Sequence, residues 1–373
     1  MKSDKSKSIL EIFSGVSDPR DPYRTRHELS SILFISLCTL LSHGEDYTDM
    51  AEFAQQRYDW LKEKVDLSNG IPSHDTFNRV FRILEPGELE SCLGKDGKSL
   101  LDHLEEKQLC LDGKKLRGAS PKGLGAEGLY ILNAWVGENR VCIGQEKVGH
   151  KSNEIKAIPN LLNKLDISGS VVTIDAIGCQ REIAELIIDK EADYLLAVKG
   201  NQAGLLEEIE DSFRFQSAHT QTFEEKWVYA HGRDEQRSCQ ILSQVHMLNP
   251  QKAEPWKNLQ TLVKVVANRQ PKGKELSTET RYYISSEKEP SPRYYNALVR
   301  GHWGIENHLH WHLDMTFKED ASRASKDWGP QNLSALRKIA LQRVAQMKDK
   351  LSLNKRRFRA ALNLVYLENI LGG

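Results

Sequence analysis

Residues 300–320 read Arg-Gly-His-Trp-Gly-Ile-Glu-Asn-His-Leu-His-Trp-His-Leu-Asp-Met-Thr-Phe-Lys-Glu-Asp, and the rest of the chain can be interpreted around this stretch. As an α-helix, it would place four ionisable side chains four residues apart along one stripe: His302, Glu306, His310 and Asp314. Three apolar residues form a neighbouring stripe that can be buried: Ile305, Leu309 and Leu313. An acid among histidines and tryptophans on such a helix suggests a site at Glu306. A helix with an aromatic core face and a solvated charged face explains the pattern equally well.

The composition limits the classes of protein that fit. With 373 residues the chain is too long for one small core, so we expect two domains or one domain with large additions. The 52 lysines and arginines balance the 52 acids, so only local charge can indicate a nucleic-acid partner. The six scattered cysteines are typical of reduced core residues. The apolar run 32–41 is too short to span a bilayer, and we expect a soluble cytoplasmic protein.

Residues 1–105 are predicted to form an N-terminal helical domain. The run 29–41 is apolar, and the segments 47–61 and 73–84 are amphipathic. Ser73-His-Asp-Thr, directly after Pro72, is typical of a capped helix start. The pattern is compatible with binding of DNA ends, with dimerisation or with a purely structural role. The acidic stretch 102–106 is the expected boundary of this domain.

From residue 106 to about 330 the pattern indicates a second domain that begins with strands. Three β-rich runs, the first two joined by a Gly-rich loop at 118–128, are expected at 108–112, 129–136 and 141–148. A helix capped by Ser152 and running to about 165 then alternates with further elements: strand 171–176, helix 180–190 and strand 194–198. This order predicts an α/β (α+β) fold in which helices flank a mixed sheet. A β-rich insertion is expected at about 204–290, with strands near 222–230, 235–243, 259–267 and 280–285.

Two aspartates at the ends of hydrophobic strands are candidate partners for Glu306. Asp112 ends the run Cys110-Leu-Asp, and Asp175 ends the run Thr173-Ile-Asp. A carboxylate at such a position is costly unless it is solvated or paired, and a bound cation is one way to pair it. Magnesium prefers carboxylate oxygen and water, and two such ions can promote displacement at a phosphodiester. Taken singly, each aspartate is equally typical of a helix cap or a turn.

The segment 331–373 is predicted to be a basic helical tail. Between Arg337 and Arg359 the chain has nine lysines and arginines against one acid, Asp349. A charge run is usually a solvated face, but this density favours a phosphate-binding surface.

Several ordered blocks of sequence carry a family resemblance. They are Asp18-Pro-Arg-Asp, Gly70-Ile-Pro-Ser-His-Asp-Thr-Phe, Leu111-Asp-Gly-Lys-Lys-Leu-Arg, Lys151-Ser-Asn-Glu-Ile-Lys-Ala-Ile-Pro, Asp175-Ala-Ile-Gly-Cys-Gln, Asp193-Tyr-Leu-Leu-Ala-Val-Lys-Gly-Asn-Gln, His231-Gly-Arg, Arg281-Tyr-Tyr-Ile-Ser-Ser and His302-Trp-Gly-Ile-Glu-Asn. Over nearly its whole length the chain resembles the H-repeat-associated proteins. These form a branch of the bacterial insertion-sequence transposases that use an Asp-Asp-Glu (DDE) active site.

The resemblance implies an RNase H-like core with a β insertion ahead of the last catalytic helix. It also implies that Asp112, Asp175 and Glu306 are the catalytic residues and hold divalent metal, as two Mg²⁺ or Mn²⁺ ions. The implied activity is DNA cleavage at the element's ends and strand transfer to target DNA. The implied partners are double-stranded DNA and a second copy of the chain. The alternative is a catalytically silent or domesticated DNA-binding relic of such a transposase.

The chain departs from the Tyr-Arg-Glu-Lys signature that related transposases carry around the glutamate. Val299 stands at the tyrosine position, His302 at the arginine position and Leu313 at the lysine position. We therefore expect other residues to contact DNA: Lys199, Arg300, His302, His310 and Lys318. His308 and His312 have zinc-ligand spacing but no recognisable third ligand. Glu154 and the block His231-Gly-Arg belong to the family pattern without a derivable role.

Overall fold

The computed structural model describes residues 8–119, 128–149, 154–230, 232–243, 251, 256–288 and 291–372. The chain forms two compact units. Unit 1 comprises Met1–His103, Gly113–Lys151 and Glu306–Gly373, and unit 2 comprises Leu104–Asp112 and Ser152–Ile305. Within the residues that the structure describes, no helix combines the length and the apolarity that a bilayer crossing requires.

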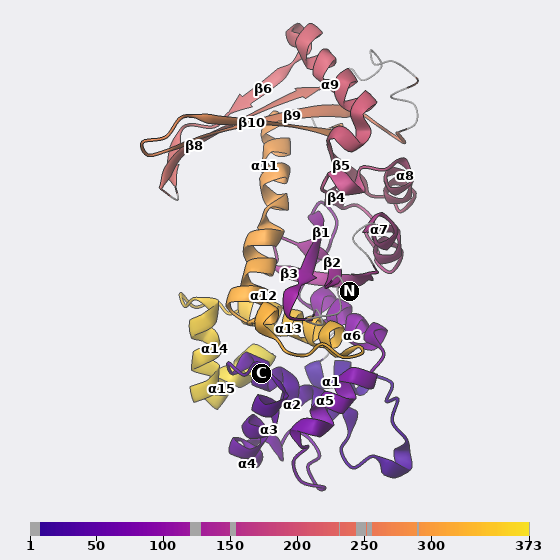
Figure 1. Cartoon of the computed structure of the whole chain (residues 1–373), viewed down its shortest axis with the longest axis vertical. Coiled ribbons are helices and arrows are strands. Elements are labelled where there is room, and N and C mark those ends of the chain that lie inside the picture. The colour runs from indigo at the N-terminus through magenta and orange to yellow at the C-terminus, as the bar shows by residue number, and fades with distance from the viewer. Residues whose placement is uncertain are drawn as a thin grey trace. The chain divides into compact units, whose positions relative to one another are not determined.

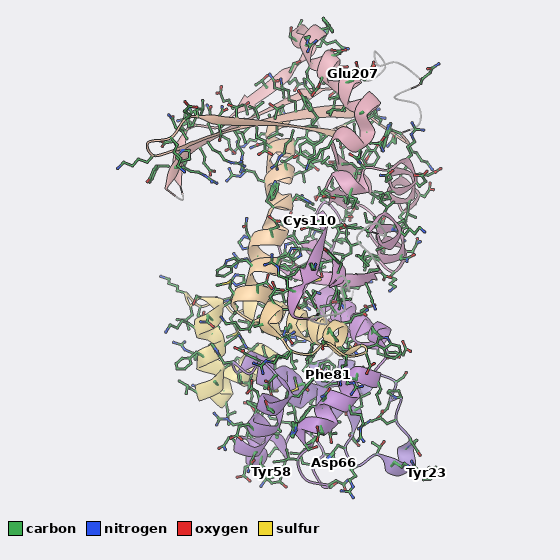
Figure 2. All side chains as sticks on the ribbon, in the orientation of Figure 1. Tyr23, Tyr58, Asp66, Phe81, Cys110 and Glu207 are labelled. Atoms are coloured by element: carbon green, nitrogen blue, oxygen red, sulfur yellow. The ribbon has the colours of Figure 1, made fainter. Side chains whose placement is uncertain are left out.

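The first part of unit 1 is helical, as predicted. Its helices are α1 (Ile9–Ser14), α2 (Leu29–Leu41), α3 (Tyr47–Gln56), α4 (Tyr58–Leu61), α5 (His74–Ile83) and α6 (Pro86–Ser99). Helix α2 is apolar on all sides and almost wholly buried, because other helices of the unit surround it. Ser73 caps α5 by accepting a hydrogen bond from the Thr76 amide, which confirms the predicted helix start. Phe81 of this helix, labelled in Figure 2, has a buried side chain.

Two strands of unit 1 form an antiparallel hairpin: β2 (Leu129–Val136) and β3 (Val141–Val148). Their bounds agree with the predicted runs. Helix α6 packs against β3 so closely that a Cβ on Gly97 would lie 2.9 Å from the Cys142 carbonyl oxygen. Residues 120–127 of the predicted Gly-rich loop and Ser152 of the predicted helix cap lie outside the described residues.

The C-terminal segment is helical, as predicted, but the phosphate-binding interpretation is wrong for much of it. Its helices are α12 (Trp311–Met315), α13 (Gly329–Ala345), α14 (Leu353–Leu362) and α15 (Leu364–Leu371). Helix α13 is buried among α2, α5 and α6 inside unit 1. Five of the nine cations of the segment are buried: Arg337, Lys338 and Arg343 on α13, and Arg356 and Arg357 on α14. Each of the five donates hydrogen bonds to groups within the unit, so these cations are structural.

Unit 2 is built on a mixed sheet. Strand β1 (Gln108–Leu116) begins in this unit and continues into unit 1. Strand order in unit 2 is β1-β4-β5-β10-β9-β8-β6, with β7 paired to β8. The first three strands are parallel, and the following pairs are antiparallel. The bounds are β4 (Val171–Ile174), β5 (Asp193–Val198), β6 (Gln221–Glu224), β7 (Val228–Ala230), β8 (Arg233–Leu242), β9 (Thr261–Pro271) and β10 (Ser277–Ser285).

Helices flank this sheet: α7 (Glu154–Asn163), α8 (Arg181–Asp189), α9 (Ala203–Phe215) and α11 (Pro292–His302). Figure 1 shows α9 and α11 on opposite sides of β9 and β10. Tyr295, Leu298 and Val299 of α11 join one apolar core with the inward residues of β4, β5, β8, β9 and β10. The predicted fold class, a mixed α/β sheet flanked by helices, is confirmed and is consistent with an RNase H-like transposase fold. The predicted β insertion continues the same sheet beyond β5.

The prediction of one regular helix across residues 300–320 is wrong. Helix α11 starts earlier, at Pro292, and ends at His302, and residues Ile305–His310 form a π-helix ahead of α12. A π-helix widens the turn, so residues four apart no longer share one stripe. The apolar stripe is nevertheless buried as predicted.

Candidate active site

Asp112 and Asp175 lie at the same level of two neighbouring parallel strands of unit 2: Asp112 is inside β1, which runs on to Leu116 and does not end at residue 112 as predicted, and Asp175 directly follows β4. Leu111 of β1 pairs with Ile174 of β4, and each aspartate comes one residue later. Adjacent strands lie about 4.8 Å apart, so the two backbones are neighbours at this edge of the sheet. Asp112 is half-buried and Asp175 is exposed. The structure therefore brings together the two aspartates that the sequence singled out.

Both aspartates belong to the sheet face that α11 covers. Side chains alternate along a strand, so Asp112 faces the same side as Gln108, and Asp175 the same side as Thr173. The Gln108 amide donates to the Leu298 carbonyl of α11 at 2.7 Å, and to the Thr173 hydroxyl at 3.0 Å. The Thr173 hydroxyl lies 3.0 Å from His302 Nδ1. A buried polar network thus joins β1, β4 and the end of α11 beside the aspartates.

Close packing supports this network. A Cβ on Gly301 would lie 2.1 Å from Gln108 Oε1, so only glycine lets α11 approach β1 to this distance. The thiol of Cys110, which is labelled in Figure 2, lies 3.8 Å from the Gly301 carbonyl oxygen. Burial raises the pKa of this thiol to about 12, so Cys110 is an inert core residue. All six cysteines are free and buried, as predicted.

His302 is neutral in the folded protein. Burial lowers the pKa of its imidazole to about 4, against the opposing effect of the Asp175 charge and with a further lowering by Arg281. Because Thr173 accepts from Gln108, its own hydrogen can go to His302 Nδ1, which favours the tautomer protonated at Nε2. His302 was predicted to contact DNA. The structure instead places its ring inside the network that supports Asp175.

The loop that carries Asp175 is fixed by the end of β5. Asp175 accepts a hydrogen bond from the Ile177 amide at 3.1 Å. Asn201 donates to the Ala176 carbonyl at 2.7 Å, and Gln202 donates to the Cys179 carbonyl at 2.9 Å. These two side chains come two and three residues after Lys199, which is exposed just past the end of β5.

The other predicted DNA contact of unit 2 is Arg300, which is exposed on α11. Its guanidinium lies 2.8 Å from Glu225, a carboxylate that also accepts from Asn296. Trp303, three residues after Arg300, is partly exposed. The Arg281 guanidinium carbon lies over its ring, 4.6 Å from the ring centroid. The end of α11 therefore carries both cationic and aromatic groups.

Glu306 belongs to unit 1 and lies in the π-helix. Its side chain is exposed, whereas Leu309 and His310 of the same π-helix are buried. His310 Nε2 lies 3.2 Å from the Asn133 amide of β2, so this ring anchors the π-helix and is not displayed at the surface. π-helical turns are frequent at functional sites. The geometry keeps the Glu306 carboxylate accessible while its neighbours hold the turn in place.

Asp314 and Lys318 of the central stretch have different surroundings in unit 1. Asp314 lies 2.6 Å from Lys114, whose ammonium also contacts the buried Glu319 at 2.9 Å. Burial alone would lower the pKa of Lys114, but Glu319 and Asp314 outweigh it and raise that pKa. Asp314 is therefore structural. Lys318 is exposed, with a left-handed backbone (φ 53°).

The aspartate pair suits part of a magnesium site. Magnesium takes oxygen ligands and commonly uses one or two carboxylates together with water and substrate phosphate. Asp112 and Asp175 supply such carboxylates from the same level of adjacent strands. Across the described residues, no group of three or more His, Cys, Asp or Glu side chains has the arrangement of a metal site.

Sequence reasoning missed the residues that support the aspartates. These are Gln108, Thr173, Asn201 and Gln202. Two of them could have been found, because Thr173 and Gln108 stand two and four residues before the aspartates and so face the same side. The roles of the other two depend on contacts between segments distant in sequence.

Nearly the whole chain is similar in sequence to known proteins. Residues 10–95 match the family described as DDE_Tnp_1-associated, and residues 103–342 match the family described as "Transposase DDE domain". A relative named "Putative transposase YncI" from Escherichia coli O157:H7 is 36% identical over 98% of this chain and 94% of its own length. "H repeat-associated putative transposase YhhI" from Escherichia coli K12 is 33% identical over 98% of each chain. "Putative protein YbfL" from the same strain is 34% identical over 98% of each chain.

Proposed function

The chain belongs to the transposases that carry a DDE domain, and we propose that it cuts DNA at the ends of an insertion sequence and joins the freed ends to target DNA. In this proposal Asp112, Asp175 and Glu306 are the catalytic carboxylates. Water first attacks a phosphodiester at the element's end and releases a 3′ hydroxyl. That hydroxyl then attacks a phosphodiester of the target, so one P–O bond forms for each one broken.

The pairing of Asp112 with Asp175 is the observation that carries this proposal. Asp112 within β1 and Asp175 directly after β4 lie at the same level of adjacent parallel strands, on the face that α11 covers. The buried bonds of Gln108 and Thr173 hold both strands and the helix in register. Glu306, exposed in the π-helix that follows α11, is the third acid that the family resemblance implies.

Divalent ions, when bound, would activate the attacking oxygen and stabilise the leaving one. The carboxylates of Asp112, Asp175 and Glu306 would hold these ions. The remaining residues contribute positioning, because in-line phosphoryl displacement depends mainly on alignment and charge neutralisation. Asn201 and Gln202 limit the movement of the Asp175 loop. Neutral His302 adds no positive charge that would compete with a cation.

Asp175→Ala is the direct test, and we expect it to abolish Mg²⁺-dependent DNA cleavage while duplex binding remains. Asp166→Ala is the matched control, because Asp166 is also exposed and accepts an amide hydrogen bond two residues on, from Ser168. Cleavage and gel-shift assays on both variants and on the unaltered chain measure the difference. Cleavage retained by Asp175→Ala would refute the assignment.

A second candidate function is a DNA-binding relic that no longer cuts. It is favoured by the departures from the Tyr-Arg-Glu-Lys signature at Val299, His302 and Leu313, since His302 is committed to Thr173. This candidate predicts salt-dependent DNA binding by the unaltered chain without any metal-dependent nicking. The same assays therefore separate the two functions.

A further inference from the structure

The strands β8, β9 and β10 continue past α11, and their α11 side becomes rich in arginine beyond the apolar core. Figure 1 shows this extension within unit 2. Cys239, Val265 and Tyr283 of these strands face α11 in the core. Alternation places further odd-numbered residues of each strand on the same face. These residues, called the arginine face here, include Arg233, Glu235, Arg237, Arg269, Glu279 and Arg281.

Acidic groups on this face neutralise only part of its charge. Glu235 pairs with Arg233, and Glu279 is shared by Arg269 at 3.1 Å and Arg281 at 2.7 Å. Arg237 lies among further cations. Burial lowers the pKa of this guanidinium and Arg300 lowers it further, although Glu235 and Glu225 act in the opposite direction. Four arginines against two glutamates leave the arginine face with a net positive charge.

The opposite face of the same strands has a different character. Its central residues are neutral and hydrogen-bond to one another, as Gln236, Asn268 and Thr278 do. Helix α9 covers part of it, where Phe213 packs on Tyr282. A cation of this face, Lys264, lies over the Phe213 ring at 5.8 Å. The concentration of arginine on one face is thus a property of that face and not of the strands in general.

We propose that the arginine face binds the phosphate backbone of duplex DNA next to the aspartate pair. Arginine suits this task because its planar guanidinium donates two hydrogen bonds to a phosphate. Successive residues of one face lie roughly 7 Å apart along a strand. Arg233 and Arg237 therefore form a row on β8 that can follow a polyanion, and Glu235 between them is paired with Arg233. The row lies on the side of the sheet that carries α11, whose end contacts Thr173 beside Asp175.

The inference rests on the proposed function, since it assigns DNA a path across the sheet towards the same carboxylates. Backbone contacts carry no sequence information. The probes can therefore be two short duplexes of unrelated sequence, bound without Mg²⁺ so that cutting does not interfere. The measured quantity is the slope of log binding constant against log salt concentration.

Arg237→Gln in the full chain should weaken binding of both duplexes equally and reduce the salt slope by about 0.9, the value for one phosphate contact. Arg237→Gln combined with Arg269→Gln should reduce it by about twice that amount. Lys264→Gln removes the same charge from the other face and should leave the slope unchanged. Circular dichroism checks that each variant is folded. If Arg237→Gln does not fold, Arg269→Gln alone is measured in its place.

Equal salt slopes for Arg237→Gln and Lys264→Gln would overturn the inference. It would also be overturned if Arg237→Gln changed the oligomeric state of the chain and left the salt slope unaltered. The two proposals fail separately. A chain that binds DNA through Arg237 but never cuts refutes the proposed function alone. A chain that cuts DNA, but whose binding is insensitive to Arg237 and Arg269, refutes the arginine face alone.

Discussion

At the scale of single residues, the neighbours of Asp175 matter as much as the acid itself. His302, which was expected to contact phosphate, is half-buried against Thr173, and its lowered pKa keeps it neutral. A histidine whose pKa is lowered by folding makes the folded state sensitive to acid. At mildly acidic pH the imidazole is protonated in the unfolded chain but not in the folded chain, so acid favours unfolding.

The folded pKa of His302 is about 4, below the ordinary 6.5, so protonation begins in the unfolded state first. Stability is therefore full above pH 6.5 and falls as the pH drops towards 4, by roughly 3 kcal/mol from this residue. Denaturant unfolding at several pH values should show that the free energy of unfolding falls less between pH 6.5 and 4 for His302→Gln than for the unaltered chain. His219→Gln, at an exposed position, is the control, and equal pH dependence of all three would contradict the assignment.

At the scale of elements, the contact of α11 with β1 decides where the central stretch begins. Gly301 gives the space, and Gln108 uses it to bond with Thr173 and the Leu298 carbonyl. The π-helix then shifts the register, so that Glu306 is exposed while His310 is buried.

Gly301→Ala should therefore destabilise unit 2. Its Cβ would displace the Gln108 side chain and leave buried polar groups unsatisfied, at a cost of about 1–3 kcal/mol. Gly87→Ala in α6 meets no atom within 4 Å and should leave stability unchanged or slightly higher. Thermal unfolding of both variants tests this, and similar melting temperatures would show that the α11–β1 contact is loose.

At the scale of the whole molecule, unit 1 is assembled from three separate stretches of the chain. Its C-terminal stretch supplies buried cations that hold the N-terminal helices together. Arg343 pairs with Asp96 at 2.5 Å, and Arg357 donates to the Leu40 carbonyl at 2.8 Å and the Gly44 carbonyl at 3.2 Å. The segment is part of the core of the unit.

Arg357→Gln should lower the free energy of unfolding by about 2–4 kcal/mol, because several carbonyl groups lose their donor. Arg359→Gln, an exposed change two residues later on α14, should have almost no effect. Denaturant unfolding compares the pair. Equal stability of the two variants would contradict the conclusion that the C-terminal segment is part of the core of unit 1.

Much of the fold could be predicted from the sequence, because local pattern encodes it. The bounds of α2, β2 and β3 agree with the apolar runs, and the cap at Ser73 was found from one tetrapeptide. The π-helix was missed, since the four-residue spacing of the stretch around Glu306 is equally compatible with a regular helix. Charge runs were also ambiguous, because burial depends on contacts that composition does not encode.

By itself the sequence determined most of the elements, the family blocks and the two aspartates in or after hydrophobic strands, since these depend on neighbouring residues along the chain. Only the tertiary structure decided that Leu111 pairs with Ile174 and so brings Asp112 beside Asp175. It also decided that Arg357 is buried, that His302 is half-buried against Thr173, and that arginines of three strands share one face. The physical reason is that strand register and helix packing bring together residues far apart in sequence, and hydrogen bonding, burial and charge then fix what each residue does.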